Sequence, residues 1–546
     1  MKQKLLSFIH VPSSFLLTTA SLLISVTFPL SPVLGQDETS LDQTSLDQTS
    51  LDQTSLDQTS LDETSLDQTS LDQTSLDETS LDQTSLDQTS LDQTSLDQTS
   101  LDQTSLDQVT PPQQLYVKGR QQLSTGQLQK ALQSFQQYLE LKRNIGDRYQ
   151  EGVALYFIGW VHDELGQYQL ARSFFEQSLA IDRELGDRTG EGSTLNNLGL
   201  TYSNLGDDQK SLEFYQQALA IYREVSNRGY EGRTLHNLGN IYYKLGQEHQ
   251  SLDSYQQALD IYREILDNPE NNSLVSQADE GTLLNSLGLV HHRLGNYEQE
   301  QLSYQQALTI AKEVSDRISE GMLLNNLGIA YHRLGKYEQA FLTHQQALVM
   351  HREVGSLAGE AFTFRTIGAV LAAQNQPELA IIFHKQAVNV YQSLGQDITK
   401  LSQQKLSEEQ KQSYKLNLDN AYLSLSELLQ QQKRVQSAEL VLNLFPVPEQ
   451  KEDLSNQDKT QTRVHDKIPY LPEEEQIKAG YEAILQQQLS LREQLNQLIT
   501  IPIAERTPVQ QDRILEFRQK QQQLTQEFLQ FLNSSEVKNL VTQLRE

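Results

Sequence analysis

The residues that most resemble a metal site are two adjacent histidines, His291 and His292, with His332 standing 40 residues after His292. Imidazole nitrogens bind zinc well, but a zinc site needs three or four protein ligands. Adjacent residues of a helix point in different directions, and no carboxylate or cysteine stands at helical ligand spacing from the pair. We therefore interpret these histidines as surface residues and expect no bound metal.

Other catalytic chemistry has no signature in the chain. There is no cysteine, which excludes a thiolate metal site, a disulfide framework and a cysteine nucleophile. No phosphate-binding loop, nucleophile elbow or dinucleotide fingerprint is present, because helix packing or a turn explains every recurrent glycine. A net charge of −29 disfavours nucleic-acid binding, since phosphate would be repelled. The sequence predicts a protein that is not an enzyme, with no cofactor and no small-molecule substrate.

The elements that would position a binding site repeat with a period of 40 residues. Seven glycines align the repeat, with one 49-residue step where an insertion falls near residues 268–272: Gly119, Gly159, Gly199, Gly239, Gly288, Gly328 and Gly368. An aromatic or histidine side chain follows each glycine by 16 positions, and mostly small residues follow by 12 and 19, with Glu300 and Tyr138 as departures. Helices pack closely where both present small side chains, so the spacing predicts about seven stacked helix pairs in one solenoid.

The repeat is clearest in residues 234–244, which read TLHNLGNIYYK. These units resemble the 40-residue tetratricopeptide repeats of kinesin light chains, and the resemblance covers roughly residues 115–395. It implies an all-α fold, a right-handed superhelical solenoid spanning residues 111–395, in which the first helix of each pair lines a concave groove.

The resemblance also implies where a protein or peptide partner would bind. In similar families, asparagines three and two positions before the recurrent glycine hold the peptide main chain, because an amide both donates and accepts hydrogen bonds. With the positions four and five after the glycine, the candidate groove residues are Asn196, Asn197, His236, Asn237, Tyr243, Lys244, Asn285, Ser286, His292, Arg293, Asn325, Asn326, His332 and Arg333. Lys244, Arg293 and Arg333 favour a partner with acidic side chains. The alternative is that the amides tie neighbouring repeats together and bind nothing.

The first 35 residues have the pattern of an export signal. Lys2 and Lys4 precede an apolar stretch over residues 15–30, and small or modest residues precede Gln36. We expect export to the periplasm or the outside of the cell. An uncleaved segment that anchors the chain is the alternative.

Residues 36–110 consist largely of the unit Leu-Asp-Gln-Thr-Ser, in which leucine recurs every five residues from Leu41 to Leu106. A five-residue step forms no stripe on a helix or a strand, and we interpret this acidic low-complexity tract as a disordered spacer. A pentapeptide-repeat β-helix is the alternative, which the tract resembles. We also hypothesise that the tract associates with the basic groove of its own solenoid, to which it is tethered.

Residues after 395 depart from the period. Residues 396–445 predict a degenerate capping helix pair, 446–472 a linker, and 473–546 a Gln-rich helical hairpin with coiled-coil character. This arrangement, with the stretch over residues 501–528, is similar to the region that precedes the CHAT peptidase-like domain of cyanobacterial repeat proteins. The resemblance carries over no catalytic residue. It leaves a second functional hypothesis, a truncated or regulatory half of a CHAT-type system that acts with a separate catalytic chain.

Overall fold

A computed structural model describes residues 111–268, 275–400, 408–443, 467–501 and 505–545, and these ranges contain helices and no strand. None of their helices combines the length and the apolar character needed to cross a membrane. The expected signal segment (1–35), the acidic tract (36–110) and most of the expected linker (446–472) lie outside the described residues.

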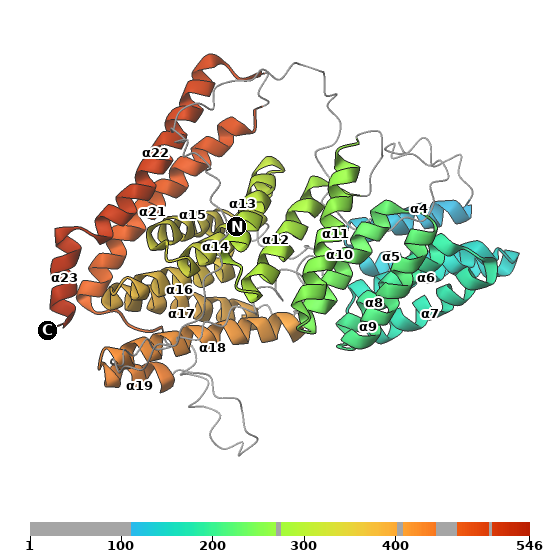
Figure 1. The fold of residues 1–546 in the computed structure, drawn as a ribbon, viewed down its shortest axis with the longest axis horizontal. Coiled ribbons are helices and arrows are strands. Elements are labelled where there is room, and N and C mark those ends of the chain that lie inside the picture. The colour runs from blue at the N-terminus through green and yellow to red at the C-terminus, as the bar shows by residue number, and fades with distance from the viewer. Residues whose placement is uncertain (1–110, 269–274, 401–407, 444–466, 502–504, 546) are drawn as a thin grey trace, which may run out of the picture. The chain divides into compact units, whose positions relative to one another are not determined.

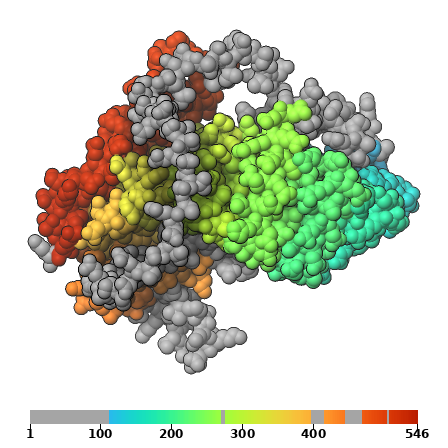
Figure 2. Space-filling view, in the orientation of Figure 1, coloured from blue at the N-terminus to red at the C-terminus, as the bar shows by residue number. Residues whose placement is uncertain are grey.

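Seven helix pairs follow one another along the chain, as the 40-residue period predicts (Figure 1). The pairs are α4 (Pro111–Ser124) with α5 (Leu128–Ile145), α6 (Arg148–Glu164) with α7 (Tyr168–Leu185), α8 (Arg188–Asn204) with α9 (Asp208–Glu224), α10 (Arg228–Lys244) with α11 (Glu248–Leu266), α12 (Gln277–Arg293) with α13 (Tyr297–Glu313), α14 (Arg317–Arg333) with α15 (Tyr337–Glu353), and α16 (Leu357–Ala373) with α17 (Pro377–Lys400). In the space-filling view, each pair lies beside the pairs that precede and follow it in sequence (Figure 2).

Local residue types explain where the helices begin and end. Gly166 adopts a φ of 70° in the turn between α6 and α7, a left-handed conformation that glycine reaches without a steric penalty. Asp187 is the residue that precedes α8 and caps it, because its carboxylate accepts a hydrogen bond from the backbone N–H of Gly190. Such caps satisfy backbone groups that the ends of a helix leave without partners.

The recurrent glycines allow the two helices of a pair to approach each other. A Cβ atom at Gly239 would lie 2.3 Å from Cε1 of Tyr255, the ring 16 positions later, and one at Gly159 would lie 2.9 Å from the ring of Phe175. The ring therefore packs against the glycine of its own helix pair. The two departures are accommodated: Tyr138 is buried and donates to Gln150 at 2.7 Å, and Glu300 is buried against His292.

The region expected to form a capping pair contains α18 (Glu408–Gln431) and α19 (Val435–Asn443). The Gln-rich region forms α21 (Pro472–Ile499), α22 (Pro508–Leu532) and α23 (Ser535–Arg545). Helices α21 and α22 form the expected hairpin, and the shorter α23 follows them. The second stretch is interrupted before Ser535, because the Ser534 hydroxyl accepts a hydrogen bond from the backbone N–H of Val537 and starts a new helix.

The C-terminal helices pack against the second helices α15 and α17 rather than projecting alone. Tyr481 of α21 stacks on Phe383 of α17 with ring centroids 4.8 Å apart. Phe528 of α22 lies 5.7 Å from the ring of Phe341 of α15. All four side chains are fully buried in one hydrophobic cluster, so the hairpin is an integral part of the core of the last repeats.

Candidate functional site

The predicted groove positions lie on helices that contact one another between repeats. The first helices of successive pairs touch directly, α6 with α8, α8 with α10, α10 with α12, and α14 with α16. A side chain near the recurrent glycine on one of these helices therefore reaches the equivalent helix of the preceding pair. The inner face is a row of equivalent positions repeated at each contact.

Three asparagines form a regular row on this face, which we call the amide row: Asn197, Asn237 and Asn326. Asn237 Nδ2 donates to Asn196 Oδ1 at 3.3 Å, and Asn326 Nδ2 donates to Asn285 Oδ1 at 3.0 Å. Asn197 Nδ2 donates to the Tyr156 hydroxyl at 2.6 Å. In each case a residue two positions before its glycine bonds to the residue three positions before the preceding glycine. Hydrogen bonds of this kind are what the alternative interpretation predicts, in which the amides join neighbouring repeats and bind no peptide.

Asn325 does not reach the groove, although the sequence pattern placed it there. Its side chain is 2% exposed. It donates to Thr363 Oγ1 at 2.8 Å and contacts His351 Nε2 at 3.0 Å and His344 Nδ1 at 3.1 Å. His344 stands where earlier repeats carry phenylalanine or tyrosine. A buried imidazole needs a hydrogen-bond partner, and the amide of Asn325 provides one. Asn285 and Ser286 are also buried.

Burial lowers the pKa of His344 and His384 to about 3. A histidine whose folded pKa lies below its unfolded value of about 6.5 stabilises the fold above pH 6.5, and that contribution is lost as the pH falls towards the folded pKa. Phe135 and Phe175 occupy the position of His384 in other repeats, so His384→Phe preserves the packing. We expect the variant to gain about 2 kcal/mol of unfolding free energy over the wild type at pH 5 relative to pH 7, measured by urea denaturation. Equal pH dependence of the two proteins would contradict this prediction.

The basic groove residues are the last residues of three successive first helices. Lys244 ends α10, Arg293 ends α12 and Arg333 ends α14. Lys244 Nζ donates to Ser203 Oγ at 2.8 Å, and the Arg293 guanidinium lies 3.4 Å from the centroid of the Tyr243 ring. Lys244 and Arg293 remain exposed at the surface. Each also lies near a carboxylate, Lys244 Nζ 3.5 Å from Asp208 Oδ1 and Arg293 Nη1 3.7 Å from Glu248 Oε1, so the positive charge at this edge of the inner face is partly compensated.

The remaining histidines of the candidate site occupy separate environments. His292 Nδ1 contacts the buried Glu300 carboxylate at 3.0 Å, while the His332 ring lies 5.4 Å from the ring of Tyr337. His236 Nε2 contacts Ser286 Oγ at 3.4 Å. Burial lowers the pKa of His291 and of His332. Within the described ranges, no three His, Cys, Asp or Glu side chains gather as a metal site would require.

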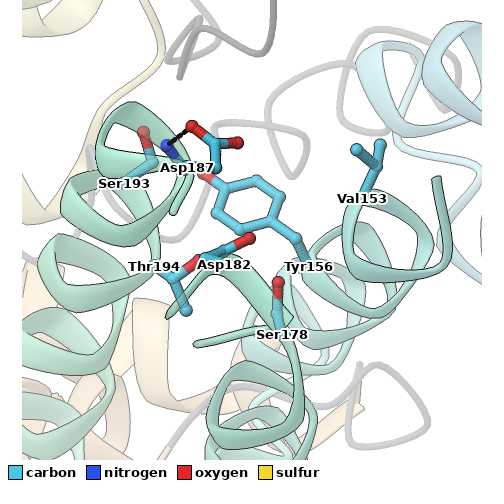
Figure 3. Close-up of a pocket in the computed structure, with 8 residues that line it drawn as sticks. Val153, Tyr156, Ser178, Asp182, Asp187, Ser193 and Thr194 are labelled. Atoms are coloured by element: carbon cyan, nitrogen blue, oxygen red, sulfur yellow. Dashed lines mark hydrogen bonds between the residues drawn. The ribbon is translucent and has the colours of Figure 1, made fainter. Parts of the chain in front are cut away.

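A pocket that the sequence analysis missed lies where α6, α7 and α8 meet (Figure 3). It is a small cavity of about 10 Å³, and it is lined by Val153, Tyr156, Ser178, Asp182, Asp187, Gly190, Ser193 and Thr194. We call it the Asp182 pocket. Tyr156 stands at the repeat position of the groove candidates Asn196 and Asn285. A signal was present in the sequence, because Asp182 occupies a position where several other repeats carry tyrosine.

Stacked helix pairs with small residues at each crossing define the class of an α-helical repeat solenoid. Residues 118–184, 190–264 and 319–393 match one family model described as tetratricopeptide repeat. Residues 282–314 match a second model with the same description. The chain therefore carries tetratricopeptide repeats, as the sequence resemblance indicated.

Residues 39–77 match the model of pentapeptide repeats, in eight copies. This match falls on the acidic tract, outside the described residues. It agrees with the alternative interpretation of the tract, a pentapeptide-repeat β-helix.

No curated protein matches the chain. Among solved structures, BtubC from P. vanneervenii is 19% identical, covering 42% of this chain and 92% of its own, with a TM-score of 0.37. The apo form of the quorum sensor NprR from B. thuringiensis is 16% identical, covering 63% and 90%, with a TM-score of 0.43. The repeats of a putative kinesin light chain from Podosopora anserina are 19% identical, covering 38% and 99%, with a TM-score of 0.31.

Proposed function

We propose that the chain is a non-catalytic scaffold whose inner face binds an extended segment of a protein partner. The amide row carries this proposal. One N–H of each asparagine is fixed to the preceding repeat, while the side-chain oxygens of Asn197, Asn237 and Asn326 accept no hydrogen bond from a described residue. All three side chains are partly exposed. The amide oxygens lie in the successive repeats of Asn197 and Asn237 and again at Asn326, one repeat beyond Ser286. Oriented acceptors of this kind suit the N–H groups of an extended peptide.

The basic edge adds a preference for acidic side chains. Lys244, Arg293 and Arg333 recur at one repeat position, so their charges line the same edge of the groove as the amide row. Charge complementarity of this kind speeds association and selects among partners. The acidic Leu-Asp-Gln-Thr-Ser tract of the same chain is the nearest source of such side chains, and we propose that it competes with external partners.

Charge reversal tests this assignment. A synthetic peptide of four Leu-Asp-Gln-Thr-Ser units is expected to bind the chain at low salt, and the triple variant Lys244→Glu, Arg293→Glu, Arg333→Glu is expected to weaken binding at least about tenfold, since each exposed charge contributes about 0.5 kcal/mol or more. Isothermal titration at low and high salt measures both effects. Binding that neither salt nor reversal alters would contradict an electrostatic contribution.

The amide variants separate binding from stability. Asn237→Ala with Asn326→Ala removes two groove amides and two hydrogen bonds between repeats, at about 1 kcal/mol of unfolding free energy each. Weaker peptide binding by a chain that stays folded supports the proposal. An unchanged affinity, together with a lower melting temperature, would leave the amides with a structural role alone.

The proposed setting is outside the cytoplasmic membrane. Its basis is the signal-like pattern of residues 1–35, and fractionation of cells that express the tagged chain tests it. The CHAT-type hypothesis has its basis in the sequence of residues 501–528. A neighbouring reading frame that encodes the peptidase domain, and a complex between the two chains, would favour that hypothesis over a scaffold that works alone.

A further inference from the structure

The Asp182 pocket exists because three positions carry small side chains at this contact between repeats and larger ones at the contact before it. Ser178, Asp182 and Gly190 take the places that Tyr138, Lys142 and Gln150 hold one repeat earlier. At that earlier contact, the Tyr138 hydroxyl donates to Gln150 Oε1 at 2.7 Å and closes the space. At the contact that follows, Tyr222 and Tyr230 stack with ring centroids 5.0 Å apart. Large side chains therefore fill the equivalent space in the preceding and following contacts between repeats, whereas the contact at Asp182 leaves a cavity.

The carboxylate at the floor of the pocket lacks a positive partner. Asp182 is 8% exposed, and its Oδ2 accepts a hydrogen bond from Thr194 at 2.8 Å. Each other buried acidic side chain in the described ranges contacts an arginine, lysine or histidine: Glu191, Glu231, Glu300, Glu320, Glu378 and Glu474. Burial, with the nearby charges of Asp187 and Glu191, raises the pKa of Asp182 to about 7. Asp163 is in a similar state, with hydrogen bonds from Thr201 and Asn204 and a pKa that burial raises to about 7, but Asp182 also lines a cavity. A positive group could therefore reach Asp182.

The preceding repeat shows which positive group fits. There the ammonium of Lys142 lies 2.7 Å from Oδ2 of Asp147, and Lys142 is at the repeat position of Asp182. Hydrogen bonding to Lys142 lowers the pKa of Asp147, although burial opposes this shift. Asp187 is the equivalent of Asp147, and it also lines the pocket, where its Oδ1 caps α8 through Gly190 N–H (Figure 3). The Asp182 pocket therefore has the equivalent aspartate, Asp187, but has Asp182 in place of the lysine.

We propose that the Asp182 pocket binds a primary ammonium group, that of a lysine side chain of a protein partner. That the partner is a protein rests on the proposed function, whereas the pocket's chemistry does not. The cavity, of about 10 Å³, has room for about one water-sized group, which is the size of an ammonium and smaller than a planar guanidinium. Gly152 and Gly190 leave Oδ1 of Asp182 approachable, since a Cβ atom at those positions would lie 3.6 and 3.1 Å from it.

The single tryptophan of the chain reports on this pocket. Trp160 follows Tyr156 by one turn of α6, with ring centroids 6.3 Å apart. Fluorescence of the full chain can therefore be followed during titration with n-butylammonium, and with n-butanol and n-butylguanidinium as neutral and planar controls. We expect n-butylammonium to bind at least about tenfold more tightly than either control. Affinity should fall as the pH is lowered below 7, because protonation of Asp182 competes with the cation.

Two variants of one residue distinguish the pocket from a nonspecific acidic surface. Asp182→Asn keeps the shape and removes the charge, and Asp182→Lys supplies an internal ammonium beside Asp187, as Lys142 does beside Asp147. Both should abolish n-butylammonium binding, and Asp182→Lys should also raise the melting temperature. Equal binding of the ammonium and n-butanol, or binding that survives in Asp182→Asn, would overturn the proposal. Failure of the acidic peptide to bind while n-butylammonium still binds would reject the groove and keep the pocket.

Discussion

Replacing Gly239 by valine is expected to lower the free energy of unfolding by more than about 3 kcal/mol, because the added side chain has no room. A Cβ atom there would lie 2.3 Å from Cε1 and 2.4 Å from Cδ1 of Tyr255. The ring is 2% exposed, and its hydroxyl donates to Asn240 Oδ1 at 2.6 Å, so it cannot move away without losing that bond. In an unobstructed helix, replacing glycine would be neutral or favourable by its helix propensity. The clash with Tyr255 therefore makes the substitution destabilising.

Chemical denaturation of the full chain measures this loss, and a double variant identifies its cause. Tyr255→Ala alone removes a buried ring and is itself destabilising. In Gly239→Val with Tyr255→Ala, however, the two side chains no longer collide, so the double variant should be more stable than the sum of the single losses. Additive losses would show that the glycine matters for some reason other than contact with the ring.

Contacts between nearby parts of the repeat could be predicted from the sequence. Gly239 and Tyr255 lie on two helices joined by a short turn. The same spacing recurs at seven glycines, and this was sufficient to predict seven helix pairs. The amide positions followed from the same register. For Asn325 the register was right and the environment was wrong, because His344 and His351 stand where other repeats carry different residues. The contact with Thr363, in contrast, recurs as the contact between Thr234 and Asn196. A repeat pattern predicts position, and individual departures from the pattern decide burial.

Contacts between distant parts of the chain could not be predicted in this way. The C-terminal hairpin packs on α15 and α17 through residues that belong to no repeat, such as Tyr481 and Glu482. Arg352 occupies the repeat position of Arg183, yet it pairs with Glu482 of α21 as well as with Glu360. The Asp182 pocket was missed for a related reason. It depends on three positions being small together, and each substitution alone looks like an ordinary variation.

Replacing Glu474 by glutamine is expected to cost about 3–5 kcal/mol and to release the C-terminal hairpin, because it leaves a buried lysine without its counter-charge. Lys385 Nζ lies 2.6 Å from Glu474 Oε2, with side-chain exposures of 6% and 0%. Burial lowers the pKa of Lys385, although Glu474 opposes this shift. Glu474 also accepts a hydrogen bond from the Leu471 backbone at the start of α21, and Arg434 of the capping pair lies 3.5 Å away. One carboxylate thus joins α17, the capping pair and the hairpin.

Hydrogen exchange of the full chain locates the effect. Faster exchange is expected in α21, α22 and α23, with the early repeats unchanged, because each unit of a solenoid is stabilised mainly by its neighbours. Glu264→Gln is the matched control, since the Arg228–Glu264 pair has a similar separation of 2.7 Å but exposures of 45% and 61%. It should cost less than about 1 kcal/mol. Replacing both buried partners, Lys385→Met with Glu474→Leu, should recover much of the loss, because it removes the unpaired charge together with the pair. If Glu474→Gln costs no more than Glu264→Gln, the buried ion pair does not hold the hairpin, and the aromatic contacts of Tyr481 and Phe528 must do so alone.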